Sequence, residues 1–284
     1  MRYVDAKRII QPNNNFNLYR GCSHGCIYCD SRSTCYEVGE FENIAVKKDA
    51  IQKVERELQS KRKRAILSTG GMSDPYVHLE KELCLTQGVL KLIQKYRFGV
   101  SVLTKSDLIL RDLEIYKNIN DNHKAIVQLT ITTTDDELAQ LIEPNVARPS
   151  KRFEVLRQFA DCGITTGIWM TPILPFIEDK EENIVAIIEQ AKAANVKFIL
   201  SYGFGTTMRE GSRDYFYDNL DKHFPGMKQK YIQLYHDNYI CPSPNSKTLS
   251  SIFEKTCERH GIIHDHQKIR ELCKSPDLEQ LRLF

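Results

Sequence analysis

The sequence predicts an α/β fold, a partial (β/α)6 barrel of the TIM type with a C-terminal α-helical extension. Short apolar runs alternate with longer amphipathic segments up to Gly205, which is the pattern of parallel βαβ units. Cysteines, a glycine pair and a lysine come directly after predicted strands, and barrels of this kind carry their active sites at the carboxyl ends of the strands. After Gly205 helical segments dominate.

Each element is predicted from periodicity and from the residues that interrupt it. Gly163 ends one helix and Thr171-Pro172 closes one strand, as is common for these residue types. The strands are expected at 16–19, 65–68, 100–104, 125–132, 166–170 and 196–202, and the barrel helices at 47–60, 80–96, 107–119, 150–162 and 180–194. The extension is expected to hold helices at 213–223, 226–236 and 247–272, with Cys241-Pro242-Ser243-Pro244 as a turn.

This pattern divides the chain into a barrel over residues 1–205, an extension over 206–279 and a tail over 280–284. With 41% hydrophobic and 27% charged residues, the composition is that of a globular protein. The net charge of +3 permits an anionic partner without requiring one. The basic run Lys61-Arg62-Lys63-Arg64 is predicted to be a solvated loop, with nucleic-acid contact as the alternative.

The start of the chain, Met-Arg-Tyr-Val-Asp-Ala-Lys-Arg, is not an apolar targeting signal. No apolar run approaches the roughly 20 residues that a membrane-spanning helix needs. We therefore expect a cytoplasmic protein without a membrane partner, in which thiols stay reduced and available for metals.

Three cysteines, Cys22, Cys26 and Cys29, lie within eight residues. Thiolates at this density are soft metal ligands. A structural zinc site needs four ligands, whereas a cubic iron–sulfur cluster held by three cysteines keeps one iron open for chemistry. The spacing predicts such a 4Fe–4S cluster, and a zinc site completed by Cys35 or His24 is the alternative.

The C-x3-C-x2-C spacing, with Tyr28 just before the last cysteine, resembles the radical S-adenosylmethionine (SAM) superfamily. The resemblance implies that the open iron binds SAM and that an electron from the cluster cleaves it. A 5′-deoxyadenosyl radical then abstracts a hydrogen atom from substrate, while the protein positions the cofactors. It also implies an electron donor such as flavodoxin or ferredoxin.

Further segments resemble one branch of this superfamily, the proteins related to spore photoproduct lyase, which reverses a thymine photoproduct in spore DNA. The segments are Asn17-Leu18-Tyr19-Arg20-Gly21-Cys22, Met72-Ser73-Asp74-Pro75-Tyr76, Leu103-Thr104-Lys105-Ser106, Ile142-Glu143-Pro144 and, beyond these, Arg152.

The resemblance also implies residues that contact SAM. The Gly70-Gly71 bend would accept the amino group through backbone carbonyls, which a side chain would obstruct. Lys105 would contact the carboxylate, Thr130 would contribute a hydroxyl and Tyr28 would pack near the adenine. Without the family resemblance, each of these residues has another explanation. Gly70-Gly71 would be a tight turn and Lys105 a solvated lysine. Thr130 would be a strand former and Tyr28 a core tyrosine.

The sequence departs from the lyase at one position. The lyase has a hydrogen-donating cysteine just ahead of the segment that matches Ser73-Asp74, where this chain has Gly71 or Met72. The resemblance therefore does not carry the photoproduct repair reaction over to this chain. Cys84 and Cys162 are predicted core residues, and Cys241, Cys257 and Cys273 are candidates for a second cluster or redox thiols.

The last five residues, Gln280-Leu281-Arg282-Leu283-Phe284, resemble the motif with which bacterial proteins bind the sliding clamp. Gln280, Leu281, Leu283 and Phe284 match that motif, with apolar anchors for a pocket beside a hydrogen-bonding glutamine. An amphipathic turn docked on the chain's own barrel is the alternative.

The leading hypothesis is a radical SAM enzyme that acts on nucleic acid in DNA repair or modification. The alternatives are a radical SAM enzyme for a protein or small molecule, and a non-enzymatic metal- or cluster-containing module recruited to DNA.

Overall fold

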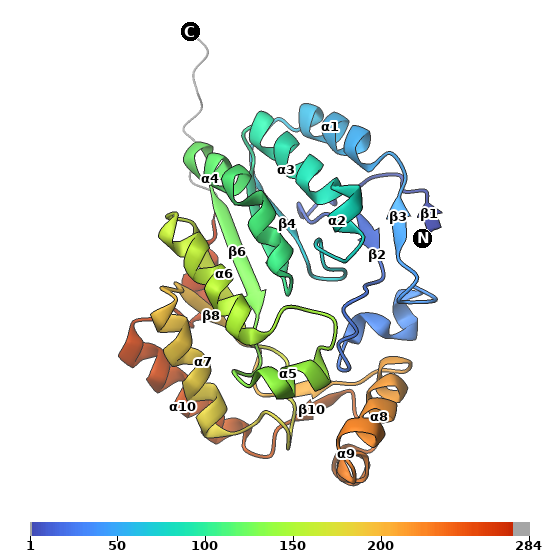
Figure 1. Cartoon of the computed structure of the whole chain (residues 1–284), viewed down its shortest axis with the longest axis vertical. Helices are drawn as coiled ribbons and strands as arrows, with labels where there is room; N and C mark the ends of the chain where they lie inside the picture. Colours follow the sequence, from blue (N-terminus) through green and yellow to red (C-terminus); the bar gives the residue numbers. More distant parts are fainter. Residues whose placement is uncertain (1, 275–284) are drawn as a thin grey trace.

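Five parallel strands form the central sheet of the computed structural model, which describes residues 2–274. They are β4 (Ile66–Thr69), β5 (Gly99–Thr104), β6 (Ala125–Thr130), β7 (Thr165–Trp169) and β8 (Phe198–Leu200), paired in that order. The sheet curves beneath a layer of helices (Figure 1). Parallel neighbours need crossover connections, and the helices between the strands supply them. The structure therefore confirms the predicted α/β partial barrel.

The crossover helices lie where apolar periodicity predicts them. They are α1 (Ala50–Ser60), α2 (Glu80–Leu83), α3 (Leu85–Lys95), α4 (Leu113–Asn122), α6 (Pro149–Asp161) and α7 (Glu181–Ala193). Residues 107–112 form a 3₁₀ turn, η3, ahead of α4. The sequence analysis missed α5 (Asp136–Ile142), which begins where Asp135 Oδ1 accepts hydrogen bonds from the amides of Glu137 and Leu138.

The structure corrects the prediction of a barrel strand at 16–19. β2 (Tyr19–Arg20) instead pairs antiparallel with β3 (Ala45–Lys47), which also pairs with β1 (Arg2–Val4) in a small separate sheet. Residues 14–16 occupy the place beside β4: the Phe16 amide donates to Ser68 O at 2.8 Å, and the Ser68 amide donates to Asn14 O at 3.0 Å. The chain therefore pairs at the barrel edge a few residues early and then turns into the cysteine loop.

The extension contains α8 (Ser212–His223), α9 (Met227–Tyr235), α10 (Ser246–His260) and α11 (His266–Leu272). The predicted single helix at 247–272 is wrong, because Gly261 adopts a left-handed φ of +67° and ends α10. The predicted proline turn is confirmed only in its second half. β10 (Ile240–Pro242) pairs antiparallel with β9 (Gly205–Thr207), and the turn follows at Ser243-Pro244, where the Ser246 amide donates to Ser243 O at 3.0 Å.

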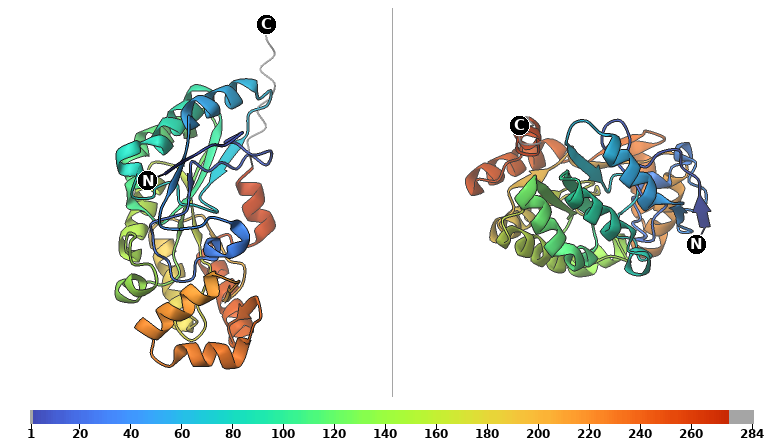
Figure 2. Two further views of the ribbon diagram at one scale, coloured as in Figure 1. Left: turned by 90° about the vertical axis from the view of Figure 1, so that its right-hand side faces the viewer. Right: turned by 90° about the horizontal axis from the view of Figure 1, so that it is seen from above.

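The extension is continuous with the barrel rather than a body beside it. Leu249, Phe253 and Cys257 of α10 belong to the main hydrophobic core, and α10 packs along α7. Ile263 bridges to Phe198 and so continues the sheet beyond β8. α8 and α9 lie at the end toward which the strands point (Figures 1 and 2). Among the helices in residues 2–274, none combines the length and apolar character of a membrane span.

Candidate cofactor and substrate site

The cysteine loop follows β2, and two anchors hold it against the barrel. The Cys22 amide donates to Phe41 O at 3.0 Å, and the Ile27 amide donates to Ile142 O at 2.9 Å. Gly21 has φ +88°, and a Cβ there would lie 2.3 Å from Phe41 O, so this approach requires glycine.

Cys22, Cys26 and Cys29 are electrostatic neighbours in this loop, since the other two thiols raise the pKa of Cys26. Burial is the main cause of its raised pKa, and burial likewise raises the pKa of the Cys22 thiol to about 12. These are free thiols without a disulfide. The three thiols thus belong to one loop, and their role as cluster ligands stays a prediction.

His24 and Cys35, the candidates for a fourth zinc ligand, have other partners. His24 Nδ1 lies 3.4 Å from Asp74 Oδ2, and Cys35 Sγ accepts from Arg209 Nη1 at 3.5 Å. In the part of the chain that the structure describes, no group of three His, Cys, Asp or Glu side chains could hold a metal ion as it stands.

A cavity of about 160 Å³ lies at the carboxyl ends of β4 to β7 and unites four of the five predicted SAM contacts. Its lining includes Gly70, Gly71, Lys105 and Thr130, together with Trp169. Gly70 has φ +106°, and a Cβ there would lie 1.9 Å from Leu103 O. A Cβ on Gly71 would meet nothing within 4 Å. The first glycine therefore makes the bend, and the second keeps the cavity open.

Asp74 fixes the rim of this cavity by joining two strand ends. Its carboxylate accepts hydrogen bonds from the Tyr76 amide at 2.8 Å, from Thr104 Oγ1 at 2.7 Å and from the Lys105 amide at 2.9 Å. Ser73 adds a bond to Gly21 O at 2.6 Å. The segment Met72–Tyr76 thereby ties the cysteine loop to the residues that follow β5.

A buried charge centre lies beneath Lys105. Glu143 Oε2 lies 2.5 Å from Arg152 Nη1, and Glu143 Oε1 lies 3.9 Å from Lys105 Nζ and accepts a hydrogen bond from Tyr28. Burial alone would raise the pKa of Glu143, but Arg152 and Lys105 hold it below its usual value. Burial would lower the pKa of Lys105, but Cys26 and Glu143 raise it. Arg152 and Lys105 thus both face Glu143, and Lys105 also interacts with the Asp74 carboxylate.

Tyr28, the fifth predicted contact, does not line the small cavity. Its ring lies 5.7 Å from Lys105 Nζ and borders a larger adjoining cavity, while its hydroxyl is bound to Glu143. Tyr28 is therefore a buried tyrosine at the edge of the larger cavity, and its contact with the cofactor stays a prediction.

The larger cavity measures about 480 Å³ and lies between the barrel mouth and the two-stranded sheet of β9 and β10. It shares Gly71, Trp169 and Thr171 with the small cavity. Its walls carry several aromatic side chains, and Trp169 packs against Tyr202 with ring centres 5.5 Å apart. The aromatic lining comes from Tyr28, Tyr36, Trp169, Tyr202 and Phe204.

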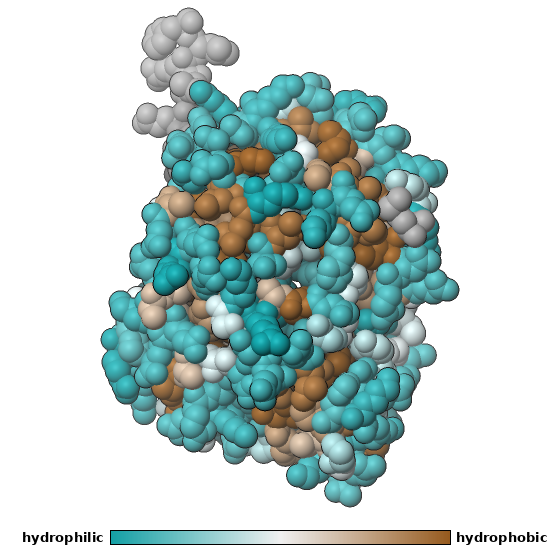
Figure 3. Space-filling model, viewed as in Figure 1, coloured by the Kyte–Doolittle hydropathy of each residue, from teal (hydrophilic) through white to brown (hydrophobic). Residues whose placement is uncertain are grey.

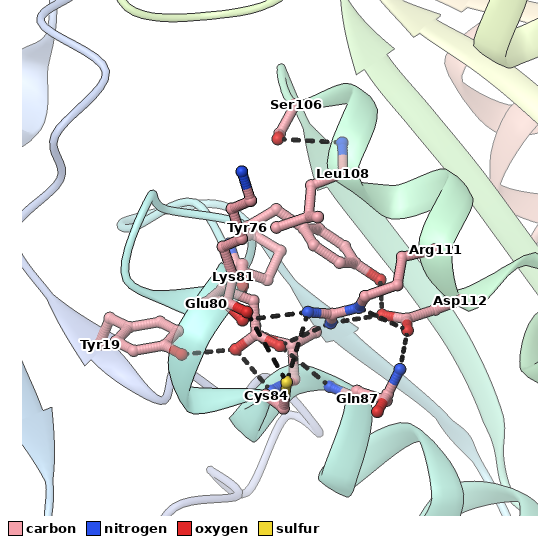
Figure 4. Close-up of polar contacts among 12 residues, drawn as sticks. Tyr19, Tyr76, Glu80, Lys81, Cys84, Gln87, Ser106, Leu108, Arg111 and Asp112 are labelled. Atoms are coloured by element: carbon pink, nitrogen blue, oxygen red, sulfur yellow. Dashed lines mark hydrogen bonds and ion pairs between the residues drawn. The ribbon is translucent and has the colours of Figure 1, made fainter.

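A buried polar network that was not predicted from the sequence lies behind the site and connects two of its segments (Figure 4). The Arg111 guanidinium lies between Glu80 and Asp112, 2.8 Å and 2.9 Å from their carboxylate oxygens. Glu80 Oε2 accepts from the Tyr19 hydroxyl at 2.5 Å, and Asp112 Oδ2 accepts from the Tyr76 hydroxyl at 3.0 Å. Tyr19 precedes the cysteine loop and Tyr76 follows Asp74, so Arg111 connects both segments. The only signal for this network in the sequence is that Tyr19 and Tyr76 lie in two of the lyase-like segments.

The remaining cysteines do not come together. Cys241 lies in the wall of the larger cavity, Cys257 in the main core and Cys273 in a third cluster beside α11. The hypothesis of a second cluster from these three is therefore wrong. Cys84 links α2 to α3 and Cys162 follows α6; both are half-buried rather than core residues, although Cys162 packs against the main core.

Comparison with known proteins places this site in a family. The profile of the Radical SAM superfamily matches residues 16–191. An uncharacterised protein of Methanocaldococcus jannaschii is 32% identical over 63% of this chain and 69% of its own. One from Mycobacterium tuberculosis is 25% identical over 88% of this chain and 75% of its own.

Solved structures show the same fold. A spore photoproduct lyase complexed with a dinucleoside spore photoproduct superposes with a TM-score of 0.65, at 13% identity over 92% of this chain and 80% of that chain. The radical SAM methyltransferase TsrM of Kitasatospora setae gives a TM-score of 0.57 at 10% identity, over 88% of this chain and 54% of that chain. With its profile match across more than half of its length and its cysteine loop at the barrel mouth, this chain belongs to the radical SAM superfamily.

Proposed function

We propose that this radical SAM enzyme abstracts hydrogen from a nucleobase or its sugar within nucleic acid. The family membership makes the chain an enzyme that uses a 4Fe–4S cluster and SAM, and excludes the non-enzymatic binding module. When bound, these cofactors supply a radical strong enough to abstract hydrogen from carbon. The chain's task is to hold them, aim the radical and exclude water.

The described residues fit both cofactors. Cys22, Cys26 and Cys29 would supply three thiolates to the cluster, and SAM would bind the iron that has no cysteine ligand. The Gly70-Gly71 bend and Lys105 surround the adjoining cavity, where backbone carbonyls suit an ammonium and the Lys105 ammonium suits a carboxylate. The neighbouring groups raise the pKa of Lys105, which keeps it cationic for that carboxylate.

The observation that carries the substrate class is the larger cavity. Its size lies within the range of ligand sites, and it meets the small cavity at Gly71 and Trp169, within reach of a bound SAM. Aromatic side chains around it match the stacking of nucleobases, which contributes about 1–3 kcal/mol per base. Tyr202 at its edge is 64% exposed, so much of its ring is accessible to a base.

The fold adds support, since the spore photoproduct lyase of similar fold was solved with a dinucleoside. We do not propose photoproduct repair itself. Met72 is 41% exposed on the cavity wall and Gly71 has no side chain, so neither offers the transferable S–H of the lyase cysteine.

The test is anaerobic turnover of the reconstituted enzyme with deuterated SAM and oligonucleotides. We expect an iron–sulfur spectrum that changes with SAM, release of 5′-deoxyadenosine, and stimulation of that release by nucleic acid. Tyr202→Ala should weaken the stimulation, whereas Tyr3→Ala, an exposed tyrosine on β1, should not.

Stoichiometric zinc without iron would overturn the cofactor assignment. SAM cleavage that no DNA or RNA stimulates, but that a peptide or an aromatic metabolite does, would overturn the nucleic-acid assignment and leave the enzyme class intact.

A further inference from the structure

The sheet brings several loops together at the end of the barrel opposite the two cavities. Neighbouring strands begin in register there, with Ile66 beside Gly99 and Val100 beside Ala125. Adjacent strands are about 4.8 Å apart. The loops at 61–65, 96–98 and 123–124 therefore form one surface, at the upper end of the molecule in Figure 1 where α1, α3 and α4 end. Residues 194–197 join it ahead of β8.

These four loops, called the basic end below, carry positive charge without compensation. They contain no Asp or Glu. Within residues 2–274, no ion pair joins their Lys and Arg side chains to a carboxylate. The acidic residues nearest to these loops in sequence are Asp121, Glu57 and Glu189, in the last turns of α4, α1 and α7. The basic residues are Lys61, Arg62, Lys63, Arg64, Arg97, Lys124 and Lys197.

Most of these charges face solvent, although a few stems are anchored. Arg62, Lys63, Arg97 and Lys197 are exposed. Arg64 lies over the Phe98 ring at 4.8 Å, which places its charge between two adjacent loops. The like charges on this surface repel one another, and the negative charges of a polyanion would offset that repulsion. Release of the polyanion's counterions would contribute further to binding.

The positions of the exposed apolar residues indicate which class of anionic partner fits the basic end. The exposed large hydrophobic residues that the structure describes all lie outside these loops, at positions such as Tyr202, Tyr239 and Ile240. A stable protein interface would need an apolar centre. A face that inserts into a bilayer would carry apolar side chains beside its charges, and attraction by charge alone contributes only about 1 kcal/mol per Lys or Arg at an anionic lipid surface. Figure 3 shows hydrophilic residues along the upper edge, over the ends of α1 and α3. A purely cationic, hydrophilic surface suits a phosphate backbone best.

We propose that the basic end binds the phosphate backbone of a nucleic acid without reading its sequence, as a second contact remote from the catalytic cavity. The inference does not require the substrate to be nucleic acid. β5 separates the two ends by its six residues, so a strand held here leaves the cavity open. The contact would raise the local concentration of nucleic acid around the enzyme.

The test measures binding of the full chain to labelled single-stranded and duplex oligonucleotides by fluorescence anisotropy across a range of NaCl concentrations. Lys63→Gln/Arg97→Gln removes two charges from the basic end. Each lost phosphate contact should lower the salt slope by about one, so we expect a decrease of about two and a loss of affinity of about tenfold or more at ~100 mM salt. Lys247→Gln/Lys255→Gln on α10 is the control with equal net charge.

The proposal is overturned if the wild-type chain binds no oligonucleotide at ~50 mM NaCl, or if the α10 control loses as much affinity as the test variant. Tighter binding to vesicles with anionic lipid than to oligonucleotides would assign the basic end to a membrane instead. Thermal unfolding of both double variants should match the wild type, since no ion pair is lost. Tyr202→Ala should leave the salt slope unchanged, which separates this inference from the proposed substrate.

Discussion

Arg152 and Glu143 form an ion pair in the interior of the barrel mouth, and each side chain is only 1% exposed. Arg152 also donates to Thr130 O at 2.8 Å and to Ala147 O at 2.7 Å. These bonds hold Glu143 beneath Lys105 and beside Tyr28. Glu143 and Arg152, which both belong to the lyase-like pattern, thus act on the cofactor cavity indirectly. Glu143 does so through Lys105 and Arg152 through Thr130.

Arg152→Met should destabilise the fold by about 3–5 kcal/mol, because it leaves the Glu143 carboxylate buried with one partner fewer. Urea unfolding measures the change. Arg148→Met, which removes an exposed arginine at the start of the same helix, should change stability by less than about 0.5 kcal/mol. Equal stability of the two variants would show that the pair does not hold Glu143 in place.

Lys105→Ala should weaken SAM binding by about 1–3 kcal/mol, the range for hydrogen bonds to charged groups. The fold should persist, because Arg152 still neutralises Glu143. Isothermal titration of the anaerobically reconstituted enzyme measures the affinity. Lys151→Ala on α6 is the matched control, and its SAM affinity should equal that of the wild type. Unchanged affinity in Lys105→Ala would remove this residue from the SAM site.

The two glycines of the bend should respond differently to alanine. Gly70→Ala should fail to fold or lose much stability, since its Cβ would lie 1.9 Å from Leu103 O at a left-handed φ. Gly71→Ala meets no atom within 4 Å and should fold normally, but it narrows the space between the two cavities. Circular dichroism and SAM titration separate these effects. Full SAM affinity in Gly71→Ala would place the cofactor elsewhere.

Glu178 should make stability depend on pH. Burial raises its pKa from 4.5 to about 8, so between these values the native state holds a proton that the unfolded chain releases. Stability from this group is therefore fully present below about pH 4.5 and decreases as pH rises to about 8, by up to ~1.4 kcal/mol per pH unit.

Glu178→Gln removes this titration and should gain stability relative to the wild type between pH 5 and pH 8. Urea unfolding at several pH values checks the expectation. The exposed Glu182→Gln should follow the wild-type curve. Parallel curves for wild type and Glu178→Gln would contradict a buried, protonated Glu178.

The clamp-binding motif remains a proposal, because residues 280–284 lie outside the described residues. A purified bacterial sliding clamp should bind the full chain modestly, with Leu283 and Phe284 as anchors. Removing residues 280–284 should abolish binding and leave cluster content and SAM cleavage intact. A truncated chain that unfolds or loses its cluster would show that the tail serves the fold.

The sequence by itself determined the fold class, the superfamily and the cysteine loop. These depend on local signals: periodicity reports which face of an element is buried, and a C-x3-C-x2-C loop brings its thiols together whatever surrounds it. The family resemblance assigned Gly70, Gly71, Lys105 and Thr130 to SAM. The structure brings them to one cavity because parallel strands place all their carboxyl ends at one edge.

Only the tertiary structure decided which residues that are distant in sequence come together. Residues 14–16, rather than 16–19, pair with β4, because edge pairing depends on the neighbouring strand and not on local propensity. The brace of Arg111 with Glu80 and Asp112 joins residues far apart in sequence, and charged side chains give no periodic signal that they will be buried. The cavity between Trp169 and the β9–β10 sheet, and the cations at the basic end, likewise arise only when distant segments meet in space.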